Sequence, residues 1–183
     1  MARAGWFVAG LVIGAVVLAP LGAYLFVKLG GLSMATSAKP LPLEETFASA
    51  ALRASLDDAA KVQDPLAMDE ANLLGGVHVY RQDCAGCHGL PGYQKTAIAQ
   101  GEFPAPPQLF EANHMVTDDP EGVTHWKVSN GIRLSGMPGF EKALSDTERW
   151  QVTMLLAHAD KLPSAAKKAL TEGAIEANVS ASR

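Results

Sequence analysis

The hydrophobic pattern divides the chain into one long apolar run and several shorter amphipathic segments. No charged residue occurs among the 24 positions from Ala4 to Val27, most of which are Ala, Val, Leu, Ile or Gly. A helix of that length reaches about 36 Å at ~1.5 Å per residue, and the hydrocarbon core of a bilayer is about 30 Å thick. Aromatic residues stand near both ends of the run, where interfacial aromatic belts lie in membrane helices. Residues 1–29 are therefore predicted to form an N-terminal transmembrane helix.

A cleaved signal peptide is the competing interpretation of this run. The apolar region of a signal peptide has about 7–15 residues, and this run is longer. Thr36-Ser37-Ala38 would be a poor cleavage site and lies far beyond it. We therefore expect a retained anchor, which makes membrane lipid a partner of the chain.

Residues 30–68 are predicted to be a linker with one helix. Gly30-Gly31 and the Ser-, Thr-, Ala- and Pro-rich stretch from Ser33 to Pro42 are typical of a linker. From Leu43 to Ala60 apolar residues recur at spacings of three to five, which predicts a helix. This helix could be a stalk, a lid on the following domain or a docking surface.

Residues 69–162 carry the pattern of a small all-α domain. Helical spacing begins near Asp69 and continues to Cys84, and Asp119-Pro120 is a helix start that leads to a glycine stop at Asn130-Gly131. Ser145 and Glu148 form a capping box before a last apolar helix. No alternating strand pattern occurs between them. Residues 163–183 form a polar and alanine-rich tail, which is predicted to be a loose helix or disordered.

Candidate chemistry is concentrated in the run Cys84-Ala85-Gly86-Cys87-His88. C-x-x-C-H is the attachment sequence for a c-type haem. Two intervening residues let one helical turn present both thiols to one haem edge, where they form thioethers, and the adjacent histidine gives the iron an imidazole ligand. These are the only two cysteines in the chain. We therefore predict one covalent haem c, with His88 as an axial ligand.

A cysteine pair of this spacing can also belong to a zinc site or a redox dithiol. A zinc site would need about two more ligands at suitable spacing, and the candidates His114 and His125 do not form an H-x3-5-H pair. A redox dithiol would need a βαβ pattern nearby, and none is visible.

The second axial ligand is sought among the methionines and histidines. Met137 lies in Gly136-Met137-Pro138-Gly139, a loop that lets the thioether reach across a haem face. The alternatives are Met68, Met115 and Met154 and, for bis-histidine ligation, His114, His125 and His158. Met154 sits on an apolar helix, as core residues do, and Met115 follows His88 closely. The loop context favours Met137, and thioether ligation raises the reduction potential.

A rigid proline-rich loop, residues 103–107, follows the motif. A proline carbonyl from such a loop can accept the Nδ1–H of His88, which fixes the tautomer of the ligand. Pro106 is the predicted acceptor.

From about Asn72 to Leu156 the chain resembles a monohaem class I cytochrome c domain. The matching pieces are Gly76-x-x-x-Tyr80, Cys84–His88, the proline-rich loop, Trp126 to Ile132, Gly136-Met137-Pro138 and the final helix with Trp150. The resemblance implies an all-α fold whose first and last helices cross near Gly76 and Tyr80. It also implies His88 and Met137 as the two iron ligands, and places Trp126 with Pro106 in the haem pocket.

The expected function is one-electron transfer rather than enzymatic catalysis, because nothing in the sequence suggests a general base beside an open iron. The partners would be redox proteins or a membrane oxidoreductase complex. The alternative is a gas sensor or small-molecule haem enzyme with a displaceable sixth ligand.

The net charge of −4 and the lack of a basic stripe exclude nucleic acid as a partner. Because haem c is attached outside the bacterial cytoplasm, we expect a single-pass inner-membrane protein with a periplasmic haem domain, in a respiratory or photosynthetic chain.

Overall fold

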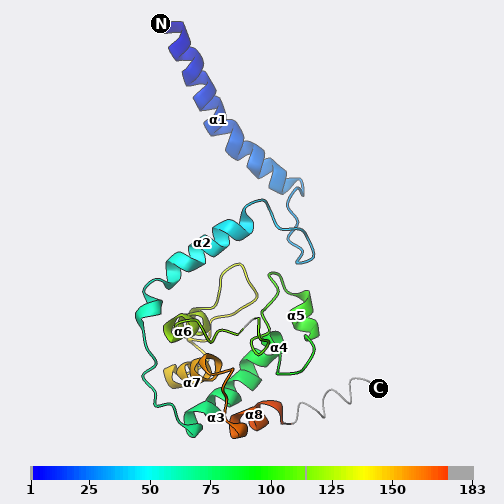
Figure 1. Ribbon diagram of the computed structural model, residues 1–183. Helices are drawn as coiled ribbons and strands as arrows, with labels where there is room; N and C mark the ends of the chain where they lie inside the picture. The colour runs from blue at the N-terminus through cyan, green and yellow to red at the C-terminus, as the bar shows by residue number, and fades with distance from the viewer. Residues whose placement is uncertain (1, 114, 173–183) are drawn as a thin grey trace, which may run out of the picture. The chain divides into compact units, whose positions relative to one another are not determined.

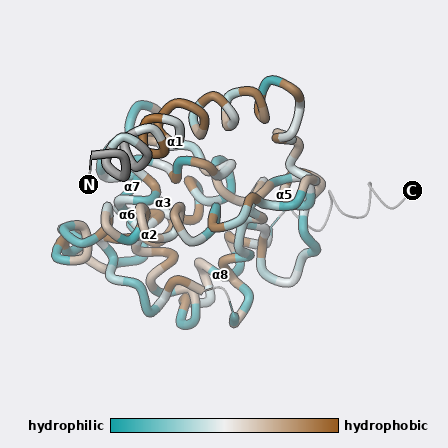
Figure 2. The backbone as a smooth tube through the Cα atoms, turned by 90° about the horizontal axis from the view of Figure 1, so that it is seen from above, coloured by the Kyte–Doolittle hydropathy of each residue, from teal (hydrophilic) through white to brown (hydrophobic). Residues whose placement is uncertain are grey.

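The computed structural model describes residues 2–113 and 115–172, and forms two compact units, Met1–Ala38 and Lys39–Arg183 (Figure 1). Within the described residues every regular element is helical, which confirms the expected all-α class. The first unit contains α1, Ala2–Lys28. Its segment Gly10–Lys28 is long and apolar enough to cross a membrane, judged by length and composition. The tube along α1 is mostly coloured as hydrophobic in Figure 2.

The second unit is built on a crossing of α3 (Glu70–Val79) with α7 (Asp146–Ala157). At the crossing, a Cβ placed on Gly76 would lie 2.2 Å from the backbone oxygen of Gln151, so only glycine allows this approach. Tyr80 is fully buried beside it and donates its hydroxyl to the Gly89 carbonyl at 2.8 Å. The predicted crossing near Gly76 and Tyr80 is confirmed.

The helix that leads into the cysteine motif is not a uniform α-helix. After α3 the chain forms a π-helical turn, Tyr80–Cys84, and then the short α4, Ala85–His88. Such wide turns are rare and are often found at functional sites. The short α5, Ala97–Gly101, follows; it is capped by the Thr96 side chain, which accepts from the Ala99 N–H.

Helix α6 (Glu121–Asn130) packs against α7 and ends at Gly131, whose φ of 70° is the left-handed conformation that glycine accepts. The N-cap of α6 is Pro120 rather than the expected Asp119. The Asp119 carboxylate instead accepts from Lys127 at 2.9 Å. The capping box of α7 forms as predicted, with the Ser145 hydroxyl accepting from the Glu148 N–H.

The domain extends beyond residues 69–162 in both directions. Helix α8 (Ser164–Thr171) buries Ala166 and Leu170, and the Ala169 carbonyl accepts from the Arg81 guanidinium at 2.7 Å. Of the two expectations for this segment, a loose helix or disorder, the structure has a helix at α8, and that helix is not loose but packs beside α3 (Figure 1). Residues 173–183 lie outside the described part of the chain.

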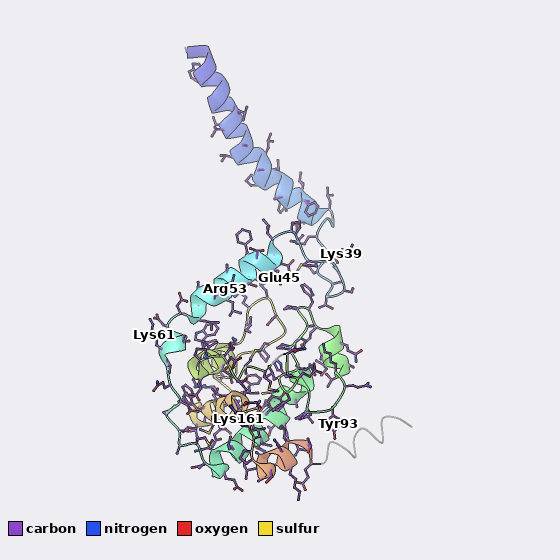
Figure 3. All side chains as sticks on the ribbon, viewed as in Figure 1. Lys39, Glu45, Arg53, Lys61, Tyr93 and Lys161 are labelled. Atoms are coloured by element: carbon purple, nitrogen blue, oxygen red, sulfur yellow. The ribbon has the colours of Figure 1, made fainter. Side chains whose placement is uncertain are left out.

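On the N-terminal side, α2 (Glu44–Leu56) buries none of its residues, whereas the turn η1 (Ala59–Lys61) packs against α6. A Cβ on Gly122 of α6 would lie 2.1 Å from the Ala59 carbonyl oxygen. Figure 3 shows Glu45 and Arg53 along α2 and Lys61 at the following turn. The segment from 59 onward is thus part of the folded domain rather than a linker.

Candidate cofactor site

A cavity of about 310 Å³ lies between α4, α6, the proline-rich loop and the loop after α6. That volume falls in the range of cofactor and ligand sites, about 300–1,000 Å³. Most of its walls are apolar or proline side chains: Leu52, Pro104, Ala105, Pro106, Pro107, Leu109, Val116, Val128, Ile132, Pro138, Phe140 and Leu156. Leu52 belongs to α2 and is half-buried, so the helix predicted to be a stalk, lid or docking surface contributes one side chain to this wall.

The two predicted thioether cysteines and the two predicted iron ligands line this cavity: Cys84, Cys87, His88 and Met137. Helix α4 brings the first three together, because its single turn starts at Cys84 as the N-cap and ends at His88. Both thiols are free and half-buried. Burial raises the pKa of the Cys84 thiol to about 12 and, with the nearby Glu102 carboxylate, also raises the pKa of Cys87. At neutral pH both groups are therefore uncharged thiols, which suits an apolar cavity.

The His88 ring is oriented by the proline-rich loop. Its Nδ1 lies 2.8 Å from the Pro107 carbonyl oxygen, and because that oxygen can only accept, Nδ1 donates and Nε2 is left as the ligating nitrogen. The sequence had suggested the Pro106 carbonyl as the acceptor. In the structure the acceptor is the Pro107 carbonyl. Pro106 lines the cavity, and its own carbonyl accepts from Gln108 Nε2 at 3.5 Å.

Gln108 is a residue that the sequence did not single out. Its buried side chain donates from Nε2 to the Cys87 carbonyl at 3.1 Å and so ties the loop to the motif. A Cβ on Gly89 would lie 2.2 Å from Gln108 Oε1, and Gly89 has a φ of 72°, so the position after His88 has two reasons to be glycine. The one sequence feature that could have indicated this Gln108–Cys87 hydrogen bond is the position of Gln108 directly after the proline-rich loop.

The loop that carries Met137 is closed by main-chain hydrogen bonds. Ile132 N–H donates to the Met137 carbonyl at 3.1 Å, and Phe140 N–H donates to the Val128 carbonyl at 2.9 Å. The Ser135 hydroxyl accepts from the Met137 N–H at 3.2 Å. This closed loop leaves the half-buried Met137 side chain at the cavity wall.

None of the described alternatives for the second axial position lines the cavity. Met154 is 2% exposed in the helical core. The His125 ring stacks on Trp150 with ring centroids 3.8 Å apart, and His158 Nδ1 pairs with the Met154 carbonyl. Met68 and Met115 are also absent from the walls, and His114 lies outside the described residues.

The expectation that Trp126 lines the haem pocket is not met. Thr124, Lys127 and Val128 form the cavity-facing side of α6, whereas Trp126 lines a second cavity behind that helix. The helical period explains the difference, because Trp126 is one step away from Lys127 and projects about 100° around the axis.

The cavity fits a haem c. It offers two thiols one helical turn apart, an imidazole with a fixed tautomer, a thioether in a closed loop and mostly apolar walls. Among the described wall residues Lys127 is the one lysine or arginine, and its Nζ is paired with the Asp119 carboxylate at 2.9 Å.

A family match supports this assignment. Residues 71–154 match the family described as cytochrome C oxidase, cbb3-type, subunit III. Among solved structures the chain is similar to a chain of the Kuenenia stuttgartiensis reducing HAO-like protein complex, at 22% identity and a TM-score of 0.44. That alignment covers 55% of this chain and 48% of the other, about half its length. No curated protein matches the chain.

The helical fold and the C-x-x-C-H cavity define a class I cytochrome c domain, and the family match covers the same residues. The chain contains a cytochrome c domain and an N-terminal helix that could span a membrane, and the domain supports haem-based electron transfer. The cytochrome family that residues 71–154 match is that of the cbb3-type oxidase subunit III.

Proposed function

We propose that this protein is a one-electron carrier, tethered to the membrane, whose haem iron is held by His88 and Met137. The observation that carries the proposal is that these two side chains line one cavity with both cysteines, whereas no other described methionine or histidine does. A second permanent ligand leaves no position for a substrate. The bound group supplies an iron that accepts and releases one electron, and the protein would not act as an enzyme.

The chain's own residues would set the properties of that site. The Pro107 carbonyl holds the His88 ring, and the closed loop holds Met137, so little of the coordination sphere would need to rearrange when the charge changes. Apolar walls such as Leu109 and Leu156 exclude water. Lys127 would stabilise the negative carboxylates of the group and favour the reduced state.

The place in the cell is also proposed. The apolar helix α1 supports a single-pass anchor in the bacterial inner membrane, with the domain on the periplasmic side where haem c is attached. The family that residues 71–154 match is described as a subunit of a cbb3-type oxidase, which supports a redox partner within a respiratory membrane complex. Retention of the full chain in alkali-washed membranes tests the anchor, and a soluble mature protein that begins near Lys39 would contradict it.

Replacement of Met137 tests the ligand set. In the oxidised parent we expect the near-infrared sulfur-to-iron band and no carbon monoxide binding after reduction at neutral pH. Met137→Ala should lose the band and bind carbon monoxide, and its potential should fall. Met68→Ala is the matched control, because Met68 is exposed and outside the cavity.

Two results would contradict the proposal. An unchanged band and potential in Met137→Ala would remove this residue as the ligand. A parent that binds carbon monoxide rapidly would favour a sensor or haem enzyme with a displaceable sixth ligand.

A further inference from the structure

Helix α2 supplies part of the haem cavity wall although it lies outside the region that matches the cytochrome family. The match begins at residue 71, whereas α2 ends at Leu56. Its residue Leu52 is half-buried and lines the cavity together with both cysteines and Met137. The two thioethers and the two proposed iron ligands do not require α2, so its contact with the cavity points to an additional role.

One face of α2 rests on the domain and the opposite face is exposed. The half-buried residues of the helix include Ala48, Leu52 and Leu56, which are four apart and share one face. Phe47 is 71% exposed. At about 100° per residue, its side chain projects about 140° away from that of Leu52. The helix is therefore oriented on the domain by a short apolar stripe, with Leu52 in the middle of the stripe.

Apolar contact attaches this face to the domain. Among the described residues, no hydrogen bond or ion pair joins Glu44–Leu56 to the chain after Asp58, and none of the residues of α2 is fully buried. The next turn, η1, is fixed by contrast. Its Ala59 is buried, and the Ala59 carbonyl lies so close to Gly122 of α6 that a Cβ there would clash. The exposed pair Asp57 and Asp58 therefore connects a helix held by apolar contact to a turn that is held rigidly.

We propose that α2 is a lid on the haem cavity, hinged at Asp57 and Asp58 and held closed by the Leu52 side chain. A helix of 13 residues is marginal in water by itself, so α2 keeps its helical form because it packs on the domain. In the closed position Leu52 keeps water from this side of the cavity. Exclusion of water disfavours the more highly charged oxidised iron and so raises the reduction potential. This effect on the haem rests on the proposed function, whereas the packing of α2 does not.

Limited trypsin digestion of the full haem-loaded chain in detergent tests the lid. Trypsin cleaves after Arg53, which lies on α2 (Figure 3), and the cut requires the helix to open. Mass spectrometry of the fragments identifies the bond that is cut.

Leu52→Ser should increase the rate of cleavage after Arg53 by about tenfold, because half of the contribution of a fully buried leucine corresponds to that factor. Phe47→Ser is the matched control. It removes an exposed apolar side chain from the outward face of the same helix, so cleavage should proceed at the parent's rate. Leu52→Met keeps an apolar side chain of similar size and should also be cleaved like the parent.

The second readouts are the reduction potential and the rate at which ferricyanide oxidises the reduced haem. Leu52→Ser should lower the potential and raise this rate, and Phe47→Ser should change neither. Equal cleavage after Arg53 in the two serine variants, or faster cleavage in Phe47→Ser, would overturn the lid. Faster cleavage in Leu52→Ser without a change in potential or oxidation rate would refute the shielding of the haem. A parent that binds carbon monoxide rapidly would contradict the proposed iron ligands, while the digestion would still decide whether Leu52 holds α2.

Discussion

Gly76→Ala should destabilise the domain because it adds an atom where two helices meet backbone to backbone. The new Cβ would lie 2.2 Å from the Gln151 carbonyl oxygen and 3.0 Å from the Leu155 Cβ. An ordinary C···O contact is about 3.3 Å, so α3 and α7 would have to separate by about 1 Å. Such a gap forfeits a quarter to a half of each dispersion contact across the crossing. Overpacking costs about 1–3 kcal/mol and the better helix propensity of alanine returns about 0.5–1, so we expect a net loss of about 1 kcal/mol.

Thermal unfolding of the haem-loaded chain measures this loss. For a chain of this size the midpoint should fall by about 2–4 °C. Gly75→Ala is the matched control, because its Cβ would meet the end of the Gln151 side chain at 2.5 Å, which can rotate away. The rotation would break the Gln151–Asn72 hydrogen bond, and the propensity gain would offset it. If Gly76→Ala proved as stable as Gly75→Ala, the reasoning from the close crossing would be refuted.

Two further predictions concern charge. Lys127→Gln removes a positive charge at the haem cavity and leaves Asp119 unpaired. A redox titration should therefore show a reduction potential lowered by up to about 59 mV, which is a tenfold change in the equilibrium constant for one electron. An unchanged or higher potential would contradict this prediction. Burial raises the pKa of Asp64, whose Oδ2 has no partner, so the ionised carboxylate costs stability as the pH rises through its folded pKa. Asp64→Asn should therefore be more stable than the parent at pH 7 but not below the unfolded pKa, and unfolding in denaturant at several pH values checks this.

The parts that the sequence predicted well are those in which a short motif determines its own geometry. Cys84, Cys87 and His88 need only one helical turn to reach one cavity, and the capping box at Ser145 needs only the first turn of its helix. Local rules of this kind require no knowledge of the rest of the chain. The helix crossing near Gly76 and Tyr80 was instead implied by the resemblance; the two positions are four apart and share one helix face.

The errors concern contacts made between distant segments. Pro106 and Pro107 are equivalent by composition, and which carbonyl meets His88 depends on how the loop docks through Gln108. Trp126 was placed in the haem pocket because of the resemblance, whereas the period of α6 turns it to the other side. Helix α8 lies where the sequence indicated a loose helix or a disordered tail, because its docking through Ala166 and Leu170 depends on α3, a partner far away in the sequence.

The sequence showed glycines around Met137, but only the fold shows why two of them, Gly131 and Gly139, must be glycine. A Cβ on Gly131 would lie 2.5 Å from the Gly139 nitrogen, and a Cβ on Gly139 would lie 2.7 Å from the Asn130 carbonyl. The two ends of the loop therefore approach at main-chain distance, which side chains at either position would prevent. Because the loop is closed in this way, backbone geometry holds Met137 at the cavity wall in addition to the packing of its side chain against the core. A substitution at Gly139, which does not line the cavity, should for this reason disturb the proposed iron ligand.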